Sequence, residues 1–143
     1  MTLNEAVKIL AILKAAYPTQ YPYNMSVDDA KLTAIVWAEQ FMNVPGDIVE
    51  IAIKKITGKD EKPPTPARVK KQIGSLYWEA KEKLDSADRK VKLGFKYPLD
   101  EKEKHLYEYI KRETCNYKYT KAIEPSIAQI VGAEEKLLLG GGS

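Results

Sequence analysis

The sequence predicts an all-α protein with a small four-helix N-terminal domain and a helical C-terminal extension. Apolar residues recur every three or four positions along several segments, as in helices with one buried face. Prolines and glycines separate these segments, and none of them shows the apolar and polar alternation of a strand. The 143 residues, 44% of them apolar, are enough for one core.

The first helix is expected over about residues 3–16. Thr2 and Glu5 have the spacing of a capping box, in which each side chain accepts a hydrogen bond from the backbone of the other residue. Tyr17 and Pro18 end the helix, because the residue before a proline avoids the α conformation.

A second helix is expected from the N-cap Ser26 to about Asn43, ahead of Pro45. Its apolar residues form a single stripe that contains Trp37 and Phe41, one turn apart. We assign both rings to core packing.

The third helix is expected over about 46–57. Its apolar positions form a face wide enough to be buried between two neighbouring helices. Gly58 follows directly and is expected to cap this helix in the left-handed conformation.

The start of the fourth helix is marked by Pro63, Pro64, Thr65 and Pro66. The prolines bar a helix before this point, whereas threonine is a good N-cap and proline suits the first helical position. The apolar register continues past residue 80, so this helix is expected to project beyond the compact domain as an arm.

The second half of the chain has a weaker pattern. Residues 86–99 are expected to form a linker or a frayed helix end, after which Asp100 and Glu103 cap a fifth helix through about Thr114. A last candidate helix opens near Glu124.

The expected organisation is therefore a helical domain over 1–85 and a helical or flexible partner-binding extension over 86–139. The final Gly-Gly-Gly-Ser, residues 140–143, has the composition of a linker or a cloning remnant and is set aside from functional reasoning.

Catalysis, cofactor binding and metal binding are not expected. The single cysteine, Cys115, and the single histidine, His105, cannot form a soft-ligand cluster, and their spacing does not support a nucleophile and base pair. We expect the cysteine to be buried or inert and the histidine to have a surface or packing role. The chain contains no GxxxxGK[ST] loop, so it has no P-loop ATPase motif.

The chain is expected to be soluble and cytoplasmic. No run approaches the roughly 18 consecutive apolar residues that span a bilayer. The N-terminus also lacks the basic start and uninterrupted apolar stretch of a secretory signal.

Positive charge is concentrated in the middle of the chain. Residues 1–53 carry three basic and six acidic side chains, whereas residues 54–73 carry seven basic and two acidic ones. Such a patch attracts nucleic acid or an acidic partner, but lysines on exposed helices also keep a small protein soluble. The net charge of +3 is low for a strong DNA binder, so DNA is a weak candidate partner. The candidate phosphate contacts are Lys54, Lys55, Arg68, Lys70, Lys71, Arg89, Lys90 and Lys92.

Five tyrosines lie among basic residues between positions 97 and 119. Such rings can pack in a core, bind a protein partner at low entropic cost, or stack on single-stranded nucleic acid. Trp78 lies off the apolar stripe of the fourth helix and is a candidate exposed anchor.

The order of these elements resembles the phage replicative-helicase loader/inhibitor family over about residues 3–73. The resemblance is carried, in chain order, by Ala16-Tyr17-Pro18, by Trp37 with Phe41, and by Pro63-Pro64-Thr65. It implies a small helical protein without an ATPase site that binds a hexameric replicative helicase, restrains it and helps to deliver it to an origin-bound initiator. It further implies a bacterial host cell, a compact N-terminal domain and a flexible C-terminal part that engages the helicase.

We therefore expect a phage DNA-replication adaptor that is not an enzyme and whose C-terminal half supplies the binding surface. The candidate contacts are apolar or aromatic residues in a half with no obvious core of its own: Tyr107, Tyr109, Ile110, Ile127, Ile130 and Val131. Two alternatives stay open, namely a small basic DNA-binding accessory protein and a phage inhibitor of the host helicase machinery.

Overall fold

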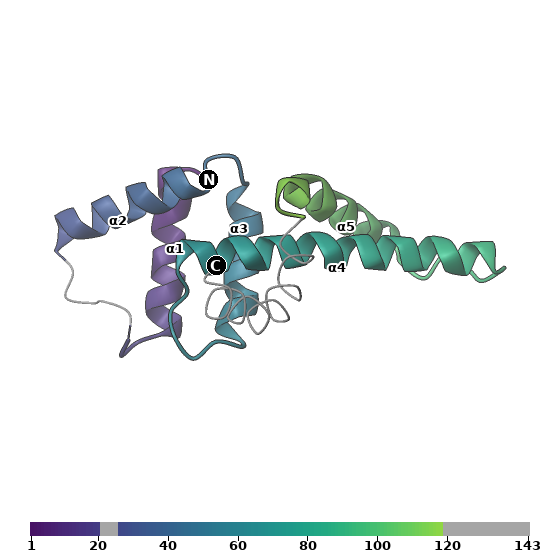
Figure 1. Cartoon of the computed structure of the whole chain (residues 1–143), viewed down its shortest axis with the longest axis horizontal. Helices are drawn as coiled ribbons and strands as arrows, with labels where there is room; N and C mark the ends of the chain where they lie inside the picture. The colour runs from purple at the N-terminus through teal and green to yellow at the C-terminus, as the bar shows by residue number, and fades with distance from the viewer. Residues whose placement is uncertain (21–25, 119–143) are drawn as a thin grey trace, which may run out of the picture.

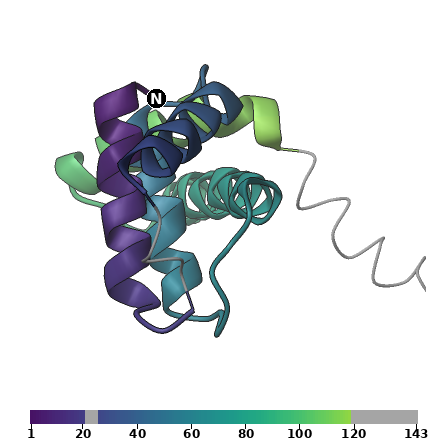
Figure 2. The same cartoon turned by 90° about the vertical axis from the view of Figure 1, so that its left-hand side faces the viewer.

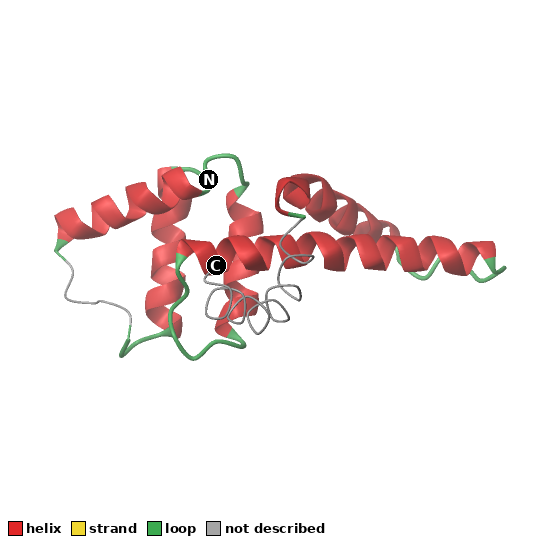
Figure 3. Ribbon diagram, viewed as in Figure 1, coloured by secondary structure: helices red, strands yellow, loops and turns green. Residues whose placement is uncertain are grey.

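The computed structural model describes residues 1–20 and 26–118, and every regular element in these ranges is a helix (Figures 1 and 3). This confirms the predicted fold class. The elements are α1 (Leu3–Ala16), α2 (Val27–Gln40), α3 (Gly46–Thr57), α4 (Pro66–Lys92), α5 (Glu101–Thr114) and the short 3₁₀ helix η1 (Cys115–Tyr117). The candidate helix near Glu124 lies outside the described residues.

The helix starts follow from the predicted caps. In α1 the Glu5 amide donates to Thr2 Oγ1 at 3.2 Å, and the Thr2 amide donates to Glu5 Oε1 at 2.8 Å. Asp100 and Glu103 form the same reciprocal pair at the start of α5. Thr65 caps α4, where its Oγ1 accepts a hydrogen bond from the backbone amide of the third helical residue at 3.2 Å. These side chains satisfy amides that would otherwise lack partners at the helix ends.

Two predictions about helix ends are wrong, and a third is partly right. Gly58 is right-handed, with φ −81° and ψ −9°, and the left-handed glycine is Gly94, with φ 91°. α2 ends at Gln40, short of the predicted Asn43, because the next residue leaves the helical conformation and places its ring in the core. The segment 86–99 is not wholly a linker, because α4 stays helical through its first part while α5 packs beside it.

The core lies between α1, α2, α3 and the first half of α4 (Figure 2). α3 occupies the middle, and its apolar residues Ile48, Val49, Ala52, Ile53 and Ile56 are all fully buried. Trp37 of α2 and Phe41, the residue that follows this helix, are buried as predicted, with ring centroids 5.8 Å apart. The wide apolar face of α3 thus explains why three other helices can pack around it.

Two motifs that are distant in sequence meet at the loop between α3 and α4. The Tyr17 hydroxyl, just after α1, donates to the backbone oxygen of Asp60 at 2.9 Å. The Arg68 guanidinium, on the first turn of α4, binds the Asp60 carboxylate with Nε to Oδ2 at 2.9 Å. The tyrosine of Ala16-Tyr17-Pro18 therefore holds the same loop that leads into Thr65. These residues fix the position at which α4 leaves the domain.

α4 extends well beyond α1, α2 and α3, and α5 runs back along it, so the two helices form a hairpin (Figure 1). Ala87, near the end of α4, is fully buried although it is far from the N-terminal core. The turn between the two helices lies at the far end of the projection. None of the described helices has both the length and the apolar character needed to cross a membrane.

Candidate partner-binding surface

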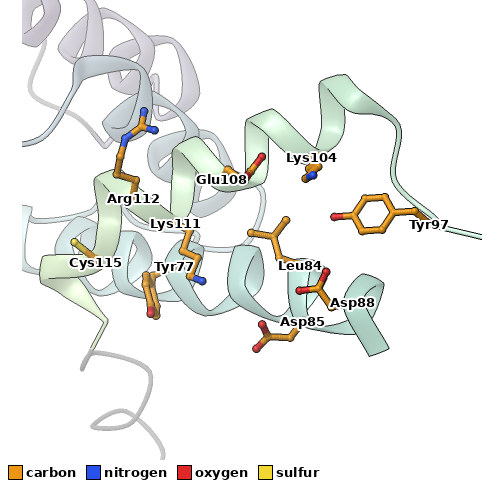
Figure 4. Close-up of a pocket in the computed structure, with 10 residues that line it drawn as sticks. All are labelled: Tyr77, Leu84, Asp85, Asp88, Tyr97, Lys104, Glu108, Lys111, Arg112 and Cys115. Carbon is orange, nitrogen blue, oxygen red and sulfur yellow. The ribbon is translucent and has the colours of Figure 1, made fainter. Parts of the chain in front are cut away.

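A groove of about 540 Å³ opens between the second half of α4 and α5 (Figure 4). α4 supplies one wall and α5 the other, and the segment that joins them closes the outer end. The residues that line the groove are Tyr77, Leu84, Asp85, Asp88, Tyr97, Lys104, Glu108, Lys111, Arg112 and Cys115.

Opposite charges line this groove in equal number, with three carboxylates and three cationic side chains. Lys81, one turn earlier on α4, donates to Asp85 Oδ2 at 2.5 Å and lowers the pKa of that carboxyl. Lys104 Nζ lies 5.5 Å from the centre of the Tyr97 ring, within the range of a cation–π contact. The groove therefore has no dominant charge, and several of its polar groups already have partners within the hairpin.

α5 uses its apolar side chains to join the N-terminal core. Ile110 is buried in that core, and Tyr107 and Tyr109 pack against it partly buried. The expectation rested on a C-terminal half with no core of its own, and these three side chains instead pack on the N-terminal core. Tyr107 and Tyr109 keep some exposed surface, whereas Ile110 lies beneath it. The other three candidate contacts, Ile127, Ile130 and Val131, lie outside the described residues.

One hydrogen-bonded pair fastens α5 to the start of α3. The Tyr109 hydroxyl lies 2.9 Å from both carboxylate oxygens of Asp47. Burial and the hydrogen bond to this carboxylate raise the pKa of Tyr109 to about 12, because both disfavour a second negative charge. Tyr109 therefore has a clear structural role in addition to any contact with a partner.

Trp78 also serves packing. Its indole forms an edge-to-face contact with Tyr77, with centroids 5.2 Å apart, and its Nε1 donates to the backbone oxygen of Lys118. Trp78 is half-buried. The interpretation of this tryptophan as an exposed anchor does not fit these contacts.

Four of the eight candidate phosphate contacts are paired with carboxylates. Lys54 reaches Glu50, Lys55 reaches Glu79, Arg68 reaches Asp60 and Arg89 reaches Glu82, at distances from 2.8 to 3.5 Å. Lys70 donates to a glutamine amide oxygen at 2.7 Å. Within residues 1–20 and 26–118, no ion pair holds Lys71, Lys90 or Lys92. Ion pairs therefore neutralise only part of the 54–73 patch, and Lys90 and Lys92 near the end of α4 have none among the described residues.

The sequence reasoning missed a group of exposed apolar residues at this end of α4. Val91, Leu93 and Phe95 all project into solvent around the turn at Gly94. A signal was present, because these residues alternate with lysines where the helical register stops. From the sequence, this segment is assigned to a linker or a frayed helix end and two of its lysines to phosphate contacts, and its apolar residues are given no role.

The residues considered for catalysis have ordinary surface positions. Cys115 is an exposed free thiol, so of the two expected states, buried or inert, the buried one is wrong. His105 is exposed on α5 with Glu101 at 3.3 Å and Glu108 at 3.7 Å, in agreement with the expected surface role. No group of three potential metal ligands occurs among the residues that the structure describes.

Comparison with known proteins gave one match. A family model for the N-terminal domain of the phage helicase loader/inhibitor gp39 matches residues 1–70, which comprise α1, α2, α3 and the first turn of α4. No curated protein and no solved structure matched the chain. The matched range contains all the residues on which the resemblance to helicase loader/inhibitor proteins was based.

Proposed function

We propose that this chain is a phage DNA-replication adaptor, because its residues 1–70 match the family model of the gp39 N-terminal domain, a family of phage helicase loaders and inhibitors. The adaptor binds a hexameric replicative helicase, restrains it and assists its loading at the origin, in the cytoplasm of the bacterial host. It has no ATPase activity of its own, in line with a family that comprises loaders and inhibitors and not enzymes. An origin-binding initiator is a second partner under this proposal.

The family match is the observation that carries this proposal, and the course of α4 supports it. The matched domain ends at residue 70, inside α4, and the same helix continues without interruption to Lys92. The domain and the projecting hairpin therefore share one rigid element. We propose that the domain is a scaffold and that the C-terminal half binds the helicase.

The proposed contacts are the exposed edges of Tyr107 and Tyr109, with Ile110 supporting them from below, and Ile127, Ile130 and Val131 further along the chain. A tyrosine offers a flat apolar ring and one polar atom at low entropic cost, which suits a protein interface. These residues follow α4 in sequence and thus come after the family-matched domain.

Restraint and loading follow from binding one helicase state more tightly than another. A ligand shifts a conformational equilibrium only by its differential affinity for the two states. Tight binding to an inactive ring holds the helicase there, and competition from the initiator or DNA releases it. The adaptor needs no nucleotide hydrolysis for this role.

The test is size-exclusion chromatography with light scattering on the full chain mixed with the phage or host hexameric helicase and ATP. We expect a co-eluting complex whose mass gives the number of adaptors per hexamer. Ile127→Asp with Ile130→Asp should weaken the complex while circular dichroism shows unchanged helix content. Two separate peaks at micromolar concentration with both helicases would reject the proposal.

A DNA-binding accessory role is a second candidate, favoured only by the lysines without an ion pair in the described residues, Lys71, Lys90 and Lys92. Together with Lys70 they offer four phosphate contacts, because four of the original eight are paired with carboxylates. The salt dependence of DNA binding tests this alternative.

A further inference from the structure

The turn that joins α4 to α5, residues 90–96, exposes three apolar side chains, and we name it the hairpin tip. Val91, Leu93 and Phe95 are 47%, 75% and 65% exposed. Single exposed apolar residues are common on protein surfaces, but three within five positions form a patch that marks a binding site. The hairpin tip lies at the far end of the projection, away from the N-terminal core (Figure 1).

The backbone of the hairpin tip is fixed. Gly94 has φ 91°, its amide donates to the Val91 oxygen at 3.0 Å, and the Phe95 amide donates to the Lys90 oxygen at 2.9 Å. These two hydrogen bonds are those of a Schellman motif, in which the residue after the glycine normally packs against an apolar residue one turn earlier. Here that earlier residue is a lysine, so the phenylalanine ring is left to solvent. A partner can thus bind the ring without first ordering the loop.

Positive charge surrounds these apolar side chains. Lys90, Lys92 and Lys96 are exposed, and the sequence from 89 to 99 contains no acidic residue. No ion pair involves any of the three lysines within the described part of the chain. The complementary surface is therefore a patch of carboxylates around an apolar pocket.

We propose that the hairpin tip inserts Leu93 and Phe95 into an apolar pocket of the helicase that is rimmed by Asp and Glu side chains. This inference rests on the proposed helicase-binding function and adds a second contact, separate from the tyrosine face of α5. A protein is the favoured partner, because protein interfaces commonly bury an aromatic side chain at their centre and surround it with a polar rim. Nucleic acid offers phosphates to the lysines but no comparable pocket for leucine.

The test measures binding of the full chain to the immobilised helicase hexamer by surface plasmon resonance. Leu93→Ser with Phe95→Ser should weaken binding by about tenfold or more, mainly through faster dissociation. The matched control is Val27→Ser with Met42→Ser, at the first residue of α2 and just beyond its last one. These side chains are 72% and 68% exposed, and the change should alter affinity by less than about twofold. All four positions are exposed, so each variant should fold, and circular dichroism checks this.

A second variant set tests the charges. Lys90→Glu, Lys92→Glu and Lys96→Glu combined should slow association and remove most of its salt dependence, because charges around an interface act on the encounter rate. The control makes the same net charge change at three exposed lysines of the N-terminal domain, Lys31, Lys59 and Lys62. The control should change association much less.

The outcomes separate this inference from the proposed function. Helicase binding that both tip variants leave unchanged overturns the inference and keeps the proposed function. Absence of any binding by the wild-type chain overturns both. Tip-dependent binding to DNA or to phosphatidylglycerol vesicles, with tip-independent helicase binding, also overturns the inference.

Discussion

Tyr109 and Asp47 are separated by 62 positions in sequence, yet their hydrogen bonds fasten the hairpin to the start of α3. No local pattern could have predicted this pair. The caps are different, because Thr2 with Glu5 is a contact across three residues and its spacing alone predicts it. At the scale of single residues, the sequence thus predicts contacts within one turn and leaves contacts between helices undetermined.

Tyr109→Phe should lower the free energy of unfolding by about 1 kcal/mol, because it removes the hydroxyl that donates to Asp47 at a partly exposed site. Urea denaturation followed by circular dichroism measures this. Tyr97→Phe is the matched control, since the Tyr97 hydroxyl has no hydrogen bond within residues 1–20 and 26–118. Equal stability of the two variants would contradict the structural role of Tyr109.

Alkaline pH should weaken the fold through the same hydroxyl. The pKa of Tyr109 is raised to about 12 in the folded state, and a tyrosine in the unfolded chain titrates near 10. Below pH 10 both states keep the proton, so this contribution to stability is fully present. As the pH rises from about 10 to 12 the unfolded state loses its proton first, and the free energy of unfolding falls.

Urea unfolding of the wild type and Tyr109→Phe at about pH 9 and pH 11, on either side of the ordinary tyrosine pKa, checks this expectation. The wild type should lose more stability between the two pH values than the variant. Tyr17 and Tyr117 also have raised pKa values, so the stability of the variant should still fall somewhat as the pH rises. An equal loss of stability in the two proteins would show that Tyr109 does not contribute to the pH dependence.

Helix boundaries were predictable to within a few residues, because caps, prolines and the apolar period are local features. The main error concerned Gly58 and Gly94, each of which follows the last residues of a helix. Local sequence does not decide which glycine adopts the left-handed conformation, because this depends on the direction in which the chain continues after the helix. After α3 the chain continues into a loop held by Tyr17 and Arg68, whereas after α4 it must reverse into α5.

Gly94→Ala should destabilise the protein by about 1 kcal/mol, because an L-residue with a side chain disfavours φ 91°. A Cβ at this position would meet no atom within 4 Å, so the cost is conformational and not steric. Gly58→Ala is the matched control, with a right-handed backbone and ordinary contacts at 3.6 Å, and should be neutral or slightly stabilising. Thermal unfolding of both variants decides the point, and equal melting temperatures would argue against the left-handed turn.

Thr65→Ala should cost about 1 kcal/mol through loss of the N-cap of α4. Thr65→Ser keeps the hydroxyl and should retain most of the stability, which separates capping from packing. Urea denaturation measures both. A serine variant as unstable as the alanine variant would assign the effect to the methyl group instead.

At the scale of the whole molecule, the sequence predicted the helical segments, including the projecting α4 and the bounds of α5, but not how α5 packs. The domain follows from strong apolar stripes and was matched by a family model. The apolar face of α5 is thin, and its place depends on where α4 projects. For the same reason the groove between α4 and α5 could not be predicted from periodicity, whereas the apolar residues of the hairpin tip left a signal in the sequence.

DNA binding, if present, should be weak and should depend only moderately on salt. The four lysines that no carboxylate holds in the described residues give a slope of about −3.6 for log K against log salt, whereas all eight candidates would give about −7. Fluorescence anisotropy with labelled duplex DNA across a salt series measures the slope. A slope near the steeper value would show that the carboxylate pairs open on binding and would favour the DNA-accessory role.

The unbroken course of α4 has a geometric consequence for any assembly on a ring. Its 27 residues measure about 40 Å, and they hold the family-matched domain and the hairpin tip at a set separation and a set angle about the helix axis. A protein that attaches by its tip would therefore hold its N-terminal domain at one distance and in one orientation relative to the helicase subunit.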